Sequence, residues 1–556
     1  MRLDHFSGAG IKMNNTALSL PSHSKLPARF ANMLSTPSDS KVEQLWWQFR
    51  GQEESLNKTH EMINSPSTKL SISLLLRSSL KDLNEPINCS LFGSSLENAK
   101  KILQQQYWEK AIDLTDVKFH MPNNRRIEWR ENVKAFNFPD FTLENLFSTL
   151  STLLLERDKF IAERVEGVFN ALSKSHVTNT PEGFYKRMII SDIHRDGFPC
   201  STRCGYINDL RIVVGRFLGR ENDNVVSSYD LVNRLMQHTG QWVEIDGGTL
   251  RIRVYKKGTA HIEVHPDIAW QLNEILAMLY PRAIPSQFRT KQKKKIKHVN
   301  LSNTLLNHDV INELGQIQPA YEMKGKPGFN LSRGNKIENR VTPRYPFSMD
   351  KHLLAKVSDV LIAIGGIALE NHEFQFDYDP MPIIEQVYFE GRIPDKYSHQ
   401  FYPTPAPLAK RMADLLGNVQ GLLLEPEAGQ GALAEYLGKD ATLVEVSSLH
   451  CEILKQKGFK NVICDDFIKW AHKTVKTNTR FAGILMNPPF SEGRAVHHLD
   501  AAISLLADKG KIVGLVTLPV ANNYYAEGMS KQITPVAQKE FKGVSVDLAI
   551  IELSKL

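Results

Sequence analysis

Four consecutive residues near the C-terminus combine an amide, two prolines and an aromatic ring: Asn487, Pro488, Pro489 and Phe490. The Asn487 side-chain oxygen and the Pro488 carbonyl can each accept one N–H of an exocyclic amine, which directs the amine's lone pair and raises its nucleophilicity. The prolines stiffen the loop and supply no amide that competes for these acceptors. Phe490 offers a stacking face for a planar base taken from a duplex or a single strand. The tetrapeptide therefore predicts catalysis by orientation and electrostatics at a base amine.

A glycine turn and two acids precede this tetrapeptide, each at the end of a predicted strand. The strand 422–426 leads into a turn with Gly429 and Gly431, where small residues let the backbone approach a nucleotide-like cofactor. Glu445 ends the next strand, 442–446, and an acid there can bind both hydroxyls of a ribose. Asp466 follows a third strand, 461–464, and could accept from an adenine amino group. A fourth strand, 481–486, delivers the tetrapeptide, so the order indicates an adenosine-containing cofactor beside it.

With these motifs, residues 400–556 resemble class I S-adenosylmethionine-dependent methyltransferases of the amino-methylating group with the (D/N/S)PP(Y/F) motif. The resemblance implies S-adenosylmethionine as cofactor, no metal, and a seven-stranded Rossmann-like sheet. The segment 400–405, QFYPTP, resembles the YxTP-like segment of adenine-N6 DNA methyltransferases, and its place ahead of the glycine turn resembles their gamma arrangement. By resemblance the cofactor-binding residues are Tyr402, Thr404, Pro405, Glu425, Gly429, Gly431, Glu445, Asp466 and Phe467, and the catalytic loop is Asn487 to Phe490.

Two features depart from that family pattern. Ser447 stands where many relatives carry further polar contacts to the cofactor. Gamma enzymes usually place a target-recognition domain after the catalytic sheet, whereas the residues after Phe490 suffice only to finish the sheet. Recognition of a base sequence must then come from the N-terminal 390 residues or from the predicted loop 521–535, where Tyr524 and Tyr525 could stack near a flipped base or be incidental.

The positive charge of the chain is concentrated in one segment. The 556 residues carry a formal charge of +7, from 68 Lys and Arg against 61 Asp and Glu. Residues 281–300 hold seven basic side chains and no acid, which equals that excess. The segment is either a solvated linker or an arm that contacts phosphates of nucleic acid. The predicted nucleic-acid-binding residues in it are Lys291, Lys293, Lys294, Lys295 and Lys297.

Composition and patterning indicate an α/β chain of about three domains. We expect a C-terminal seven-stranded methyltransferase sheet and a larger, mainly helical α+β N-terminal region. The predicted parts are a flexible segment (1–40), a mainly helical domain ending in a β-hairpin and a helix (41–280), a basic linker or arm (281–345), a connecting α+β segment (346–395) and the methyltransferase domain (396–556). One long helix is expected to start at Asp140 or Thr142 and continue to about residue 172, whereas 301–345 shows little periodicity.

The N-terminal region more loosely resembles an uncharacterised domain found ahead of such methyltransferases on bacterial plasmids and phages. The segments that carry this resemblance are 204–220, 248–265 and 376–405. Cys200 and Cys204 are more readily structural cysteines than zinc ligands, because no second cysteine pair accompanies them. Five scattered cysteines, with neither a signal peptide nor a membrane-spanning run, favour the reducing bacterial cytoplasm or nucleoid.

The sequence thus favours transfer of a methyl group to adenine N6 in DNA, on a base flipped from the duplex, with protection of mobile-element DNA from restriction as its setting. A second interpretation keeps the chemistry and changes the acceptor to an RNA amine or a glutamine side chain. A third is a DNA-binding or anti-defence protein whose methyltransferase domain is vestigial. Oligomeric state, target sequence and a nuclease partner are not encoded in any pattern we recognise.

Overall fold

The computed structural model describes most of the chain as two compact units, residues 1–301 and 302–556. The described residues are 39–78, 95–114, 121–174, 176, 179, 182–184, 187–218, 227–280, 284–290, 305–326, 329–393, 402–490, 493–537, 540 and 546–555. Lys291, Lys293, Lys294, Lys295 and Lys297 lie outside these ranges, so their predicted role stays a prediction. Among the described residues, no helix is both long and apolar enough to cross a lipid bilayer.

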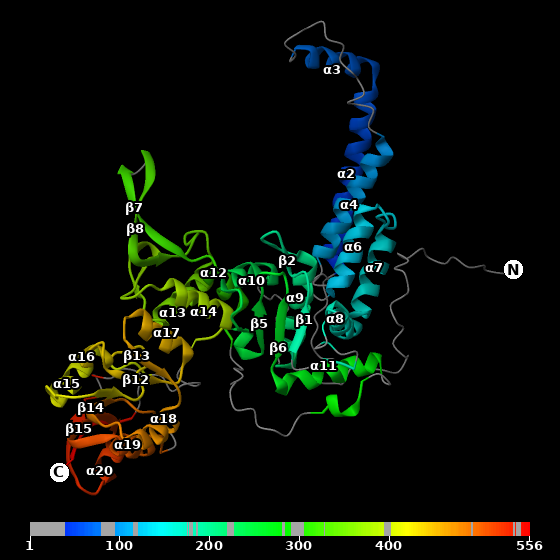
Figure 1. The fold of residues 1–556 in the computed structure, drawn as a ribbon. Coiled ribbons are helices and arrows are strands. Elements are labelled where there is room, and N and C mark those ends of the chain that lie inside the picture. The colour runs from blue at the N-terminus through cyan, green and yellow to red at the C-terminus, as the bar shows by residue number, and fades with distance from the viewer. Residues whose placement is uncertain are drawn as a thin grey trace. The chain divides into compact units, whose positions relative to one another are not determined.

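The first unit begins with helices that bury a shared aromatic core. These are α2 (Asp39–Asn64), α3 (Pro66–Ser78), α4 (Leu96–Leu114), α6 (Asn123–Lys134), α7 (Leu143–Leu155) and α8 (Arg157–Ala171). Figure 1 shows α4 beside α2 and α6 beside α4. Trp108 is fully buried between them, edge-on to Trp129 and Phe141, and its indole N–H donates to the Pro139 carbonyl.

The single helix expected from Asp140 or Thr142 onward is wrong, because the chain breaks at Glu156 into α7 and α8. Arg125 of α6 pairs with Glu156 at 2.9 Å and with Glu163 of α8 at 2.7 Å. One arginine therefore binds the carboxylate at the break and a second carboxylate within α8. Helical periodicity alone does not reveal the break, since Arg125, which pairs with Glu156, lies about 30 residues earlier in the chain.

A four-stranded antiparallel sheet follows in the same unit, in the order β1-β6-β5-β4. Its strands are β1 (Arg187–Ile190), β4 (Val243–Ile245), β5 (Leu250–Val254) and β6 (Ala260–Val264). The hairpin expected around residues 256–259 is confirmed as β5 and β6, and the helix after it is α11 (Pro266–Leu279). The remaining elements are β2 (His194–Arg195), β3 (Phe198–Pro199), α9 (Ser201–Phe217) and α10 (Ser228–Leu235).

Cys200 and Cys204 belong to the start of α9. Cys200 is the N-cap residue, and its carbonyl accepts from the Cys204 amide at 2.9 Å. The Cys204 side chain is buried. In the part of the chain that the structure describes, no cluster of three or more His, Cys, Asp or Glu side chains could hold a metal ion.

The second unit opens with a smaller α+β layer. It contains α12 (His308–Leu314), β7 (Gln318–Lys326), β8 (Phe329–Thr342), α13 (Lys351–Ala363), β9 (Ile367–Ala368), β10 (Phe374–Gln375) and α14 (Met381–Glu390), with strand order β7-β8-β10-β9. The β7–β8 hairpin falls where the sequence shows little periodicity. Register shifts between Pro319 and Tyr321, Tyr321 and Met323, and Lys324 and Lys326 interrupt the two-residue alternation that would reveal a strand.

The predicted seven-stranded sheet is confirmed at the C-terminal end of the chain, with strand order β13-β12-β11-β14-β15-β17-β16. The strands are β11 (Leu423–Glu425), β12 (Thr442–Glu445), β13 (Asn461–Cys464), β14 (Phe481–Met486), β15 (Leu506–Thr517), β16 (Met529–Val536) and β17 (Leu548–Lys555). Strands β11 to β15 are parallel, and β17 pairs antiparallel with β15 and β16.

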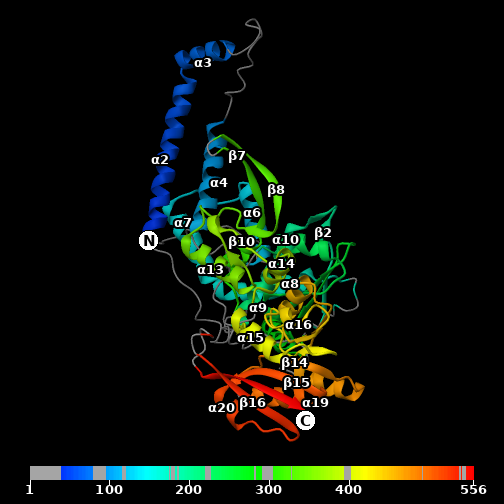
Figure 2. The same ribbon diagram turned by 90° about the vertical axis from the view of Figure 1, so that its left-hand side faces the viewer.

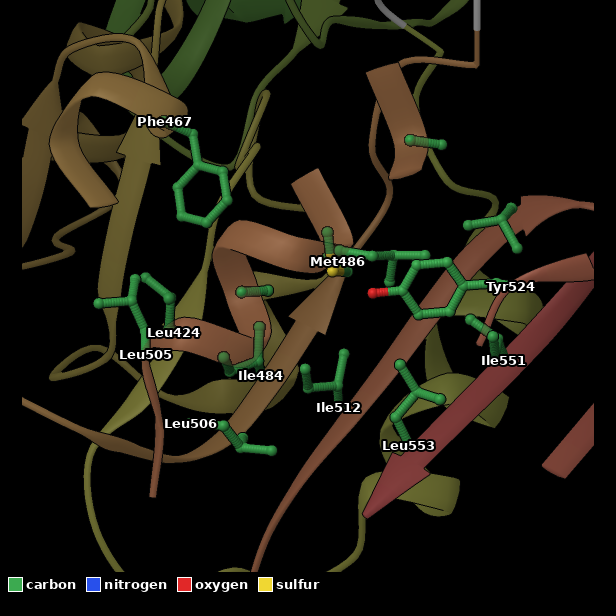
Figure 3. Close-up of a cluster of buried hydrophobic side chains, with 14 of the residues drawn as sticks. Leu424, Phe467, Ile484, Met486, Leu505, Leu506, Ile512, Tyr524, Ile551 and Leu553 are labelled. Carbon is green, nitrogen blue, oxygen red and sulfur yellow. The ribbon is translucent and has the colours of Figure 1, made fainter. Parts of the chain in front are cut away.

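Helices cover both faces of this sheet, because side chains of alternate residues point to opposite faces. Leu485 of β14 packs with α15 (Ala406–Leu416). Its neighbours Ile484 and Met486 pack with α18 (Phe467–Thr474), α19 (Arg494–Ser504) and α20 (Leu518–Asn523), as Figure 3 shows. Figure 2 shows α19, α20 and β16 near β15. The sheet also carries α16 (Ala434–Leu437) and α17 (Ser448–Gln456).

The smaller layer of the second unit packs on α17. Leu449 and Ile453 of α17 share a buried cluster with α13 and α14, and Lys457 forms a 2.9 Å ion pair with Asp377. In addition, Gln430 of the glycine turn donates to the Ala363 carbonyl at 2.6 Å. Residues 305–393 therefore support the glycine turn and α17 of the seven-stranded sheet.

Candidate active site

The candidate site lies at the carboxyl ends of β11, β12 and β14. The chain leaves β11 toward β12 and β13 on one side, then crosses to β14 on the other side of β11. In open α/β sheets, ligands bind in the crevice at such a reversal, beyond the carboxyl ends of the strands. The turn after β11, the acid at the end of β12 and the tetrapeptide after β14 all follow strands that reach this edge.

Asn487 is held in one orientation by two hydrogen bonds. Its Nδ2 donates to the Tyr402 carbonyl at 3.1 Å and to the Thr404 hydroxyl at 3.0 Å. Because a carbonyl can only accept, the nitrogen of the Asn487 amide must face Tyr402. Its Oδ1 is buried and makes no hydrogen bond within the described part of the chain. Burying an unsatisfied acceptor costs about 1–3 kcal/mol, so this oxygen is poised to accept from an N–H donor.

Two aromatic rings lie together beside this amide. Tyr402 and Phe490 stack with ring centroids 6.3 Å apart and an interplanar angle of 29°. Both rings are half-buried against the cluster that α15 forms with β14 and β15. The sequence prediction grouped Tyr402 with the cofactor-binding residues, and the structure brings its backbone to Asn487 and its ring to Phe490.

Glu445 organises the glycine turn through its carboxylate. Oε2 accepts from the Gly429 amide at 2.8 Å, and Oε1 accepts from the Ser447 amide at 2.7 Å. Burial by itself would raise the pKa of Glu445. The contact with His450 at 3.8 Å and the two backbone amides outweigh that effect and hold its pKa below the ordinary value. The carboxylate is thus stabilised in its charged form, and each oxygen keeps a further lone pair for a hydroxyl donor.

The turn itself needs glycine at two places. Gly429 and Gly431 have φ angles of 53° and 89°, in the left-handed region. A Cβ on Gly431 would also lie 3.0 Å from a side-chain carbon of Leu454. Ser447, the departure from the family pattern, is the N-cap of α17, and its hydroxyl accepts from the His450 amide. The backbone and side chain of Ser447 therefore fix the Glu445 end of the site.

Glu425 and Glu427 form a second acidic group, of which the sequence predicted only Glu425. Glu425 is buried at the end of β11 with Oε2 unpartnered among the described residues. Burial, and then the charges of Glu427 and Glu445, raise its pKa well above the ordinary value. Glu427 bonds His498 of α19 at 2.5 Å. The sequence analysis missed this pair because 71 residues separate its members, and only the adjacent histidines 497–498 signal it.

Asp466 and Phe467 make mainly internal contacts. The Asp466 side chain caps α18 by accepting from the Lys469 amide at 2.9 Å. Phe467 is buried in the core cluster of Figure 3, and its ring lies 5.6 Å from that of His498. Their predicted contacts to adenine stay predictions, and any such contact would leave the cap of α18 in place.

The expected loop 521–535 is largely regular structure. Residues 518–523 form α20 and residues 529–536 form β16 at the sheet edge. Tyr524 is a core residue, 6% exposed, whose hydroxyl donates to Asp500 at 2.7 Å. The option that Tyr524 stacks on a flipped base is therefore wrong. Tyr525 is 83% exposed and keeps that option.

Comparison with known families matches residues 100–282 to a domain of unknown function, DUF4942. This agrees with the uncharacterised domain expected there. The segments 204–220 and 248–265 lie inside the match, whereas 376–405 lies outside it and belongs to the second unit. A search of curated proteins finds no match.

Solved structures similar to part of the chain carry methyltransferase names. TrmN from Thermus thermophilus is 17% identical with a TM-score of 0.24, over 27% of this chain and 49% of TrmN, so the chain spans about half its length. A putative RNA methyltransferase from Pyrococcus horikoshii is 19% identical with a TM-score of 0.24, over 30% of this chain and 92% of that one. A putative class I S-adenosylmethionine-dependent methyltransferase from Listeria monocytogenes is 14% identical with a TM-score of 0.24, over 37% and 73%. With scores this low, only this chain's own residues can argue for a substrate.

Proposed function

We propose that this protein transfers a methyl group from S-adenosylmethionine to the exocyclic N6 amine of adenine in DNA. One observation carries the proposal: the Asn487 amide is fixed so that its unpartnered, buried Oδ1 faces away from Tyr402 and Thr404. An amine N–H supplies the missing donor. A carbon nucleophile brings no such donor, and a hydroxyl brings one O–H where an amine brings two N–H groups for Asn487 Oδ1 and the Pro488 carbonyl.

The residues at the sheet edge fit the cofactor. Gly429 and Gly431 keep side chains out of the turn where a nucleoside must approach the backbone. Glu445 is held charged with lone pairs to spare for the two ribose hydroxyls. Bound there, S-adenosylmethionine supplies a methyl group on a positively charged sulfonium, which is an excellent leaving group. The glycine turn and the Glu445 carboxylate therefore fit the groups that S-adenosylmethionine would present to them.

The chain's own contribution is to orient the amine. Asn487 Oδ1 and the Pro488 carbonyl accept the two N–H groups, so the nitrogen lone pair points along one direction. Holding reactants in a near-attack arrangement supplies much of the rate in such reactions. Phe490, backed by Tyr402, offers a face for the base. Methylation of the nitrogen would release one amine proton, which leaves to solvent.

DNA is the preferred acceptor for three reasons. The QFYPTP segment with Phe490 resembles adenine-N6 DNA methyltransferases, and the N-terminal region is large and locally basic, with seven basic side chains and no acid in residues 281–300. An adenine inside a duplex must also be flipped out to reach such a loop, and a flipped base finds an aromatic surface there. Protection of plasmid or phage DNA from restriction is the setting we propose for this activity.

The test offers each acceptor separately. The protein is incubated with cofactor carrying a labelled methyl group and with plasmid DNA, total RNA or cell protein, and the modified unit is identified after digestion. We expect label on adenine in DNA. Label found only in RNA or only on glutamine would show that the acceptor is not DNA. No label in any of the three samples would favour a DNA-binding or anti-defence protein whose methyltransferase domain is vestigial. Asn487→Ala should abolish transfer, whereas Asp508→Ala, at an exposed position near the start of β15, is a control for folding.

A further inference from the structure

The four-stranded sheet of the first unit has one face rich in arginine. On β5, Leu250, Ile252 and Val254 are buried, so Arg251 and Arg253 project from the opposite face. On β6, His261 and Glu263 share that face. The sheet is thus packed on one side and charged on the other.

Two guanidinium groups flank the Glu263 carboxylate on this face, and Glu244 of β4, opposite Arg251, adds a second carboxylate. Glu263 stands opposite Arg187 of β1 and Arg251 of β5 in the strand register. Arg187 donates to one carboxylate oxygen at 2.8 Å, and Arg251 donates to the other at 2.5 Å. Three arginines on the face outnumber its two carboxylates by one, and Lys256 and Lys257 of the β5–β6 turn add two further positive charges. Arg187 and Arg251 remain 46% and 37% exposed.

Trp242 gathers three arginines around its ring. The guanidinium carbons of Arg187, Arg251 and Arg253 lie 5.4, 5.3 and 5.9 Å from the ring centroid. Arg253 also lies 5.1 Å from the Tyr255 ring. Within the described ranges, Arg253 makes no ion pair, and its Nε is buried without a hydrogen-bond partner. Its charge is therefore balanced by no carboxylate.

An open hollow adjoins these residues. It has a volume of ≈ 510 Å³ and is lined by Thr239, Gly240, Tyr255, Lys256, Lys257, Thr259 and His261. Lys256 and Lys257 are exposed at the β5–β6 turn, and the Tyr255 and His261 rings lie 4.6 Å apart. Burial is the main reason that the pKa of His261 is lowered; the charges of Arg187, His176 and Arg253 add to it, and Glu263 opposes it.

We infer that this surface, the cationic face (Arg187, Trp242, Arg251, Arg253, Lys256 and Lys257), binds the phosphate backbone of duplex DNA. Guanidinium and ammonium groups bind phosphates by charge-assisted hydrogen bonds, and their charge releases counterions from DNA. An acidic peptide would meet the same charges, and the proposed activity on DNA favours phosphates as the ligand of this face. The inference deepens the proposed function by naming a surface that holds the substrate, and it does not require methyl transfer.

The test measures binding of a fluorescent DNA duplex to the full-length protein at several salt concentrations, without cofactor. The variant Arg253→Gln/Lys256→Gln/Lys257→Gln removes three charges for which the described part of the chain supplies no carboxylate partner. Each phosphate contact contributes about 0.9 to the slope of log K against log salt, which near 0.15 M salt is roughly fivefold in affinity. We expect the slope to fall by about 2–3 and the affinity by on the order of 100-fold.

The matched control, Lys58→Gln/Lys69→Gln/Lys101→Gln, removes three exposed lysine charges from helices α2, α3 and α4 of the same unit. Equal losses in the two triple variants would overturn the inference, because net charge alone would then explain binding. If the first variant unfolds, Lys256→Gln/Lys257→Gln alters only the exposed turn and should still reduce the slope by about 2. Tighter, face-dependent binding of an RNA duplex of the same sequence would overturn the DNA assignment. If the first variant still methylates DNA and binds it as tightly as the wild type, this inference is overturned, whereas the proposed function is not.

Discussion

Thr404→Val separates two roles for a residue of the QFYPTP segment. Sequence resemblance assigns Thr404 to the cofactor, whereas in the structure its buried hydroxyl accepts from Asn487 Nδ2 at 3.0 Å. Valine keeps the shape and removes that acceptor. The Tyr402 carbonyl would then hold the amide alone, and one Asn487 N–H would be left unsatisfied.

The expected cost follows from that lost bond. Leaving a buried donor without a partner costs about 1–3 kcal/mol, which corresponds to roughly a 5- to 150-fold loss of rate if Asn487 loses its alignment. Because Thr404 acts through Asn487, kcat should fall while the Kd for S-adenosylhomocysteine stays the same. Thr404→Ser keeps the hydroxyl and should restore most of kcat.

The assay combines steady-state methyl transfer with calorimetric titration of S-adenosylhomocysteine for the wild type and both variants. A weaker Kd with unchanged kcat for Thr404→Val would refute the positioning role and return Thr404 to the cofactor. Loss of both parameters in Thr404→Ser as well would show that side-chain volume, rather than the hydroxyl, matters at this position.

Further predictions concern charge, packing and the basic segment. Glu445→Gln should weaken S-adenosylhomocysteine binding by about 10- to 150-fold. A glutamine amide has one oxygen and cannot accept hydrogen bonds from both the Gly429 and the Ser447 amides, and a hydrogen bond to a charged group contributes about 1.5–3 kcal/mol. Folding lowers the pKa of Glu445, so the charged carboxylate stabilises the fold fully above its unfolded pKa near 4.5, and this stabilisation is lost as the pH falls through the lower folded pKa. The free energies of unfolding in urea of the wild type and Glu445→Gln should therefore become equal in acid. A difference between them that does not change with pH would contradict this. Leu499→Ala should destabilise the protein by about 2–5 kcal/mol in urea unfolding, because Leu499 is fully buried in the core cluster, and a loss below 1 kcal/mol would mean that α19 is loosely packed. Replacing Lys291, Lys293, Lys294 and Lys295 by Ala should weaken DNA binding and flatten its salt dependence, whereas an unchanged slope would make the segment a linker.

Local signals predicted much of the catalytic sheet. Strands that end in an acid or in the NPPF loop are short, apolar and bounded by turns, so Glu445 and Asn487 could be placed at strand ends from sequence alone. The parallel order then follows from their sequence, because strands linked by helices pair in parallel. The contact between Gly429 and Glu445 agrees with that expectation.

Long-range contacts account for what the sequence did not reveal. Thr404 reaches Asn487 across 83 residues, and Glu427 reaches His498 across 71. The sequence places Tyr524 in a loop, whereas in the structure its hydroxyl donates to Asp500 and its ring is buried in the core cluster. The cationic face is equally hidden, because Trp242 lies 55 residues after Arg187 in the chain and the sheet register alone brings them together. Periodicity reports which residues share a face, and it does not report which faces meet.

The most direct test of the central claim identifies the methylated atom. Duplex DNA is incubated with the protein and cofactor carrying a deuterated methyl group, then digested to nucleosides and analysed by mass spectrometry. The structure predicts deuterated N6-methyladenine with the wild type and none with Asn487→Ala. Label on cytosine, on RNA alone or at full level with Asn487→Ala would contradict the account.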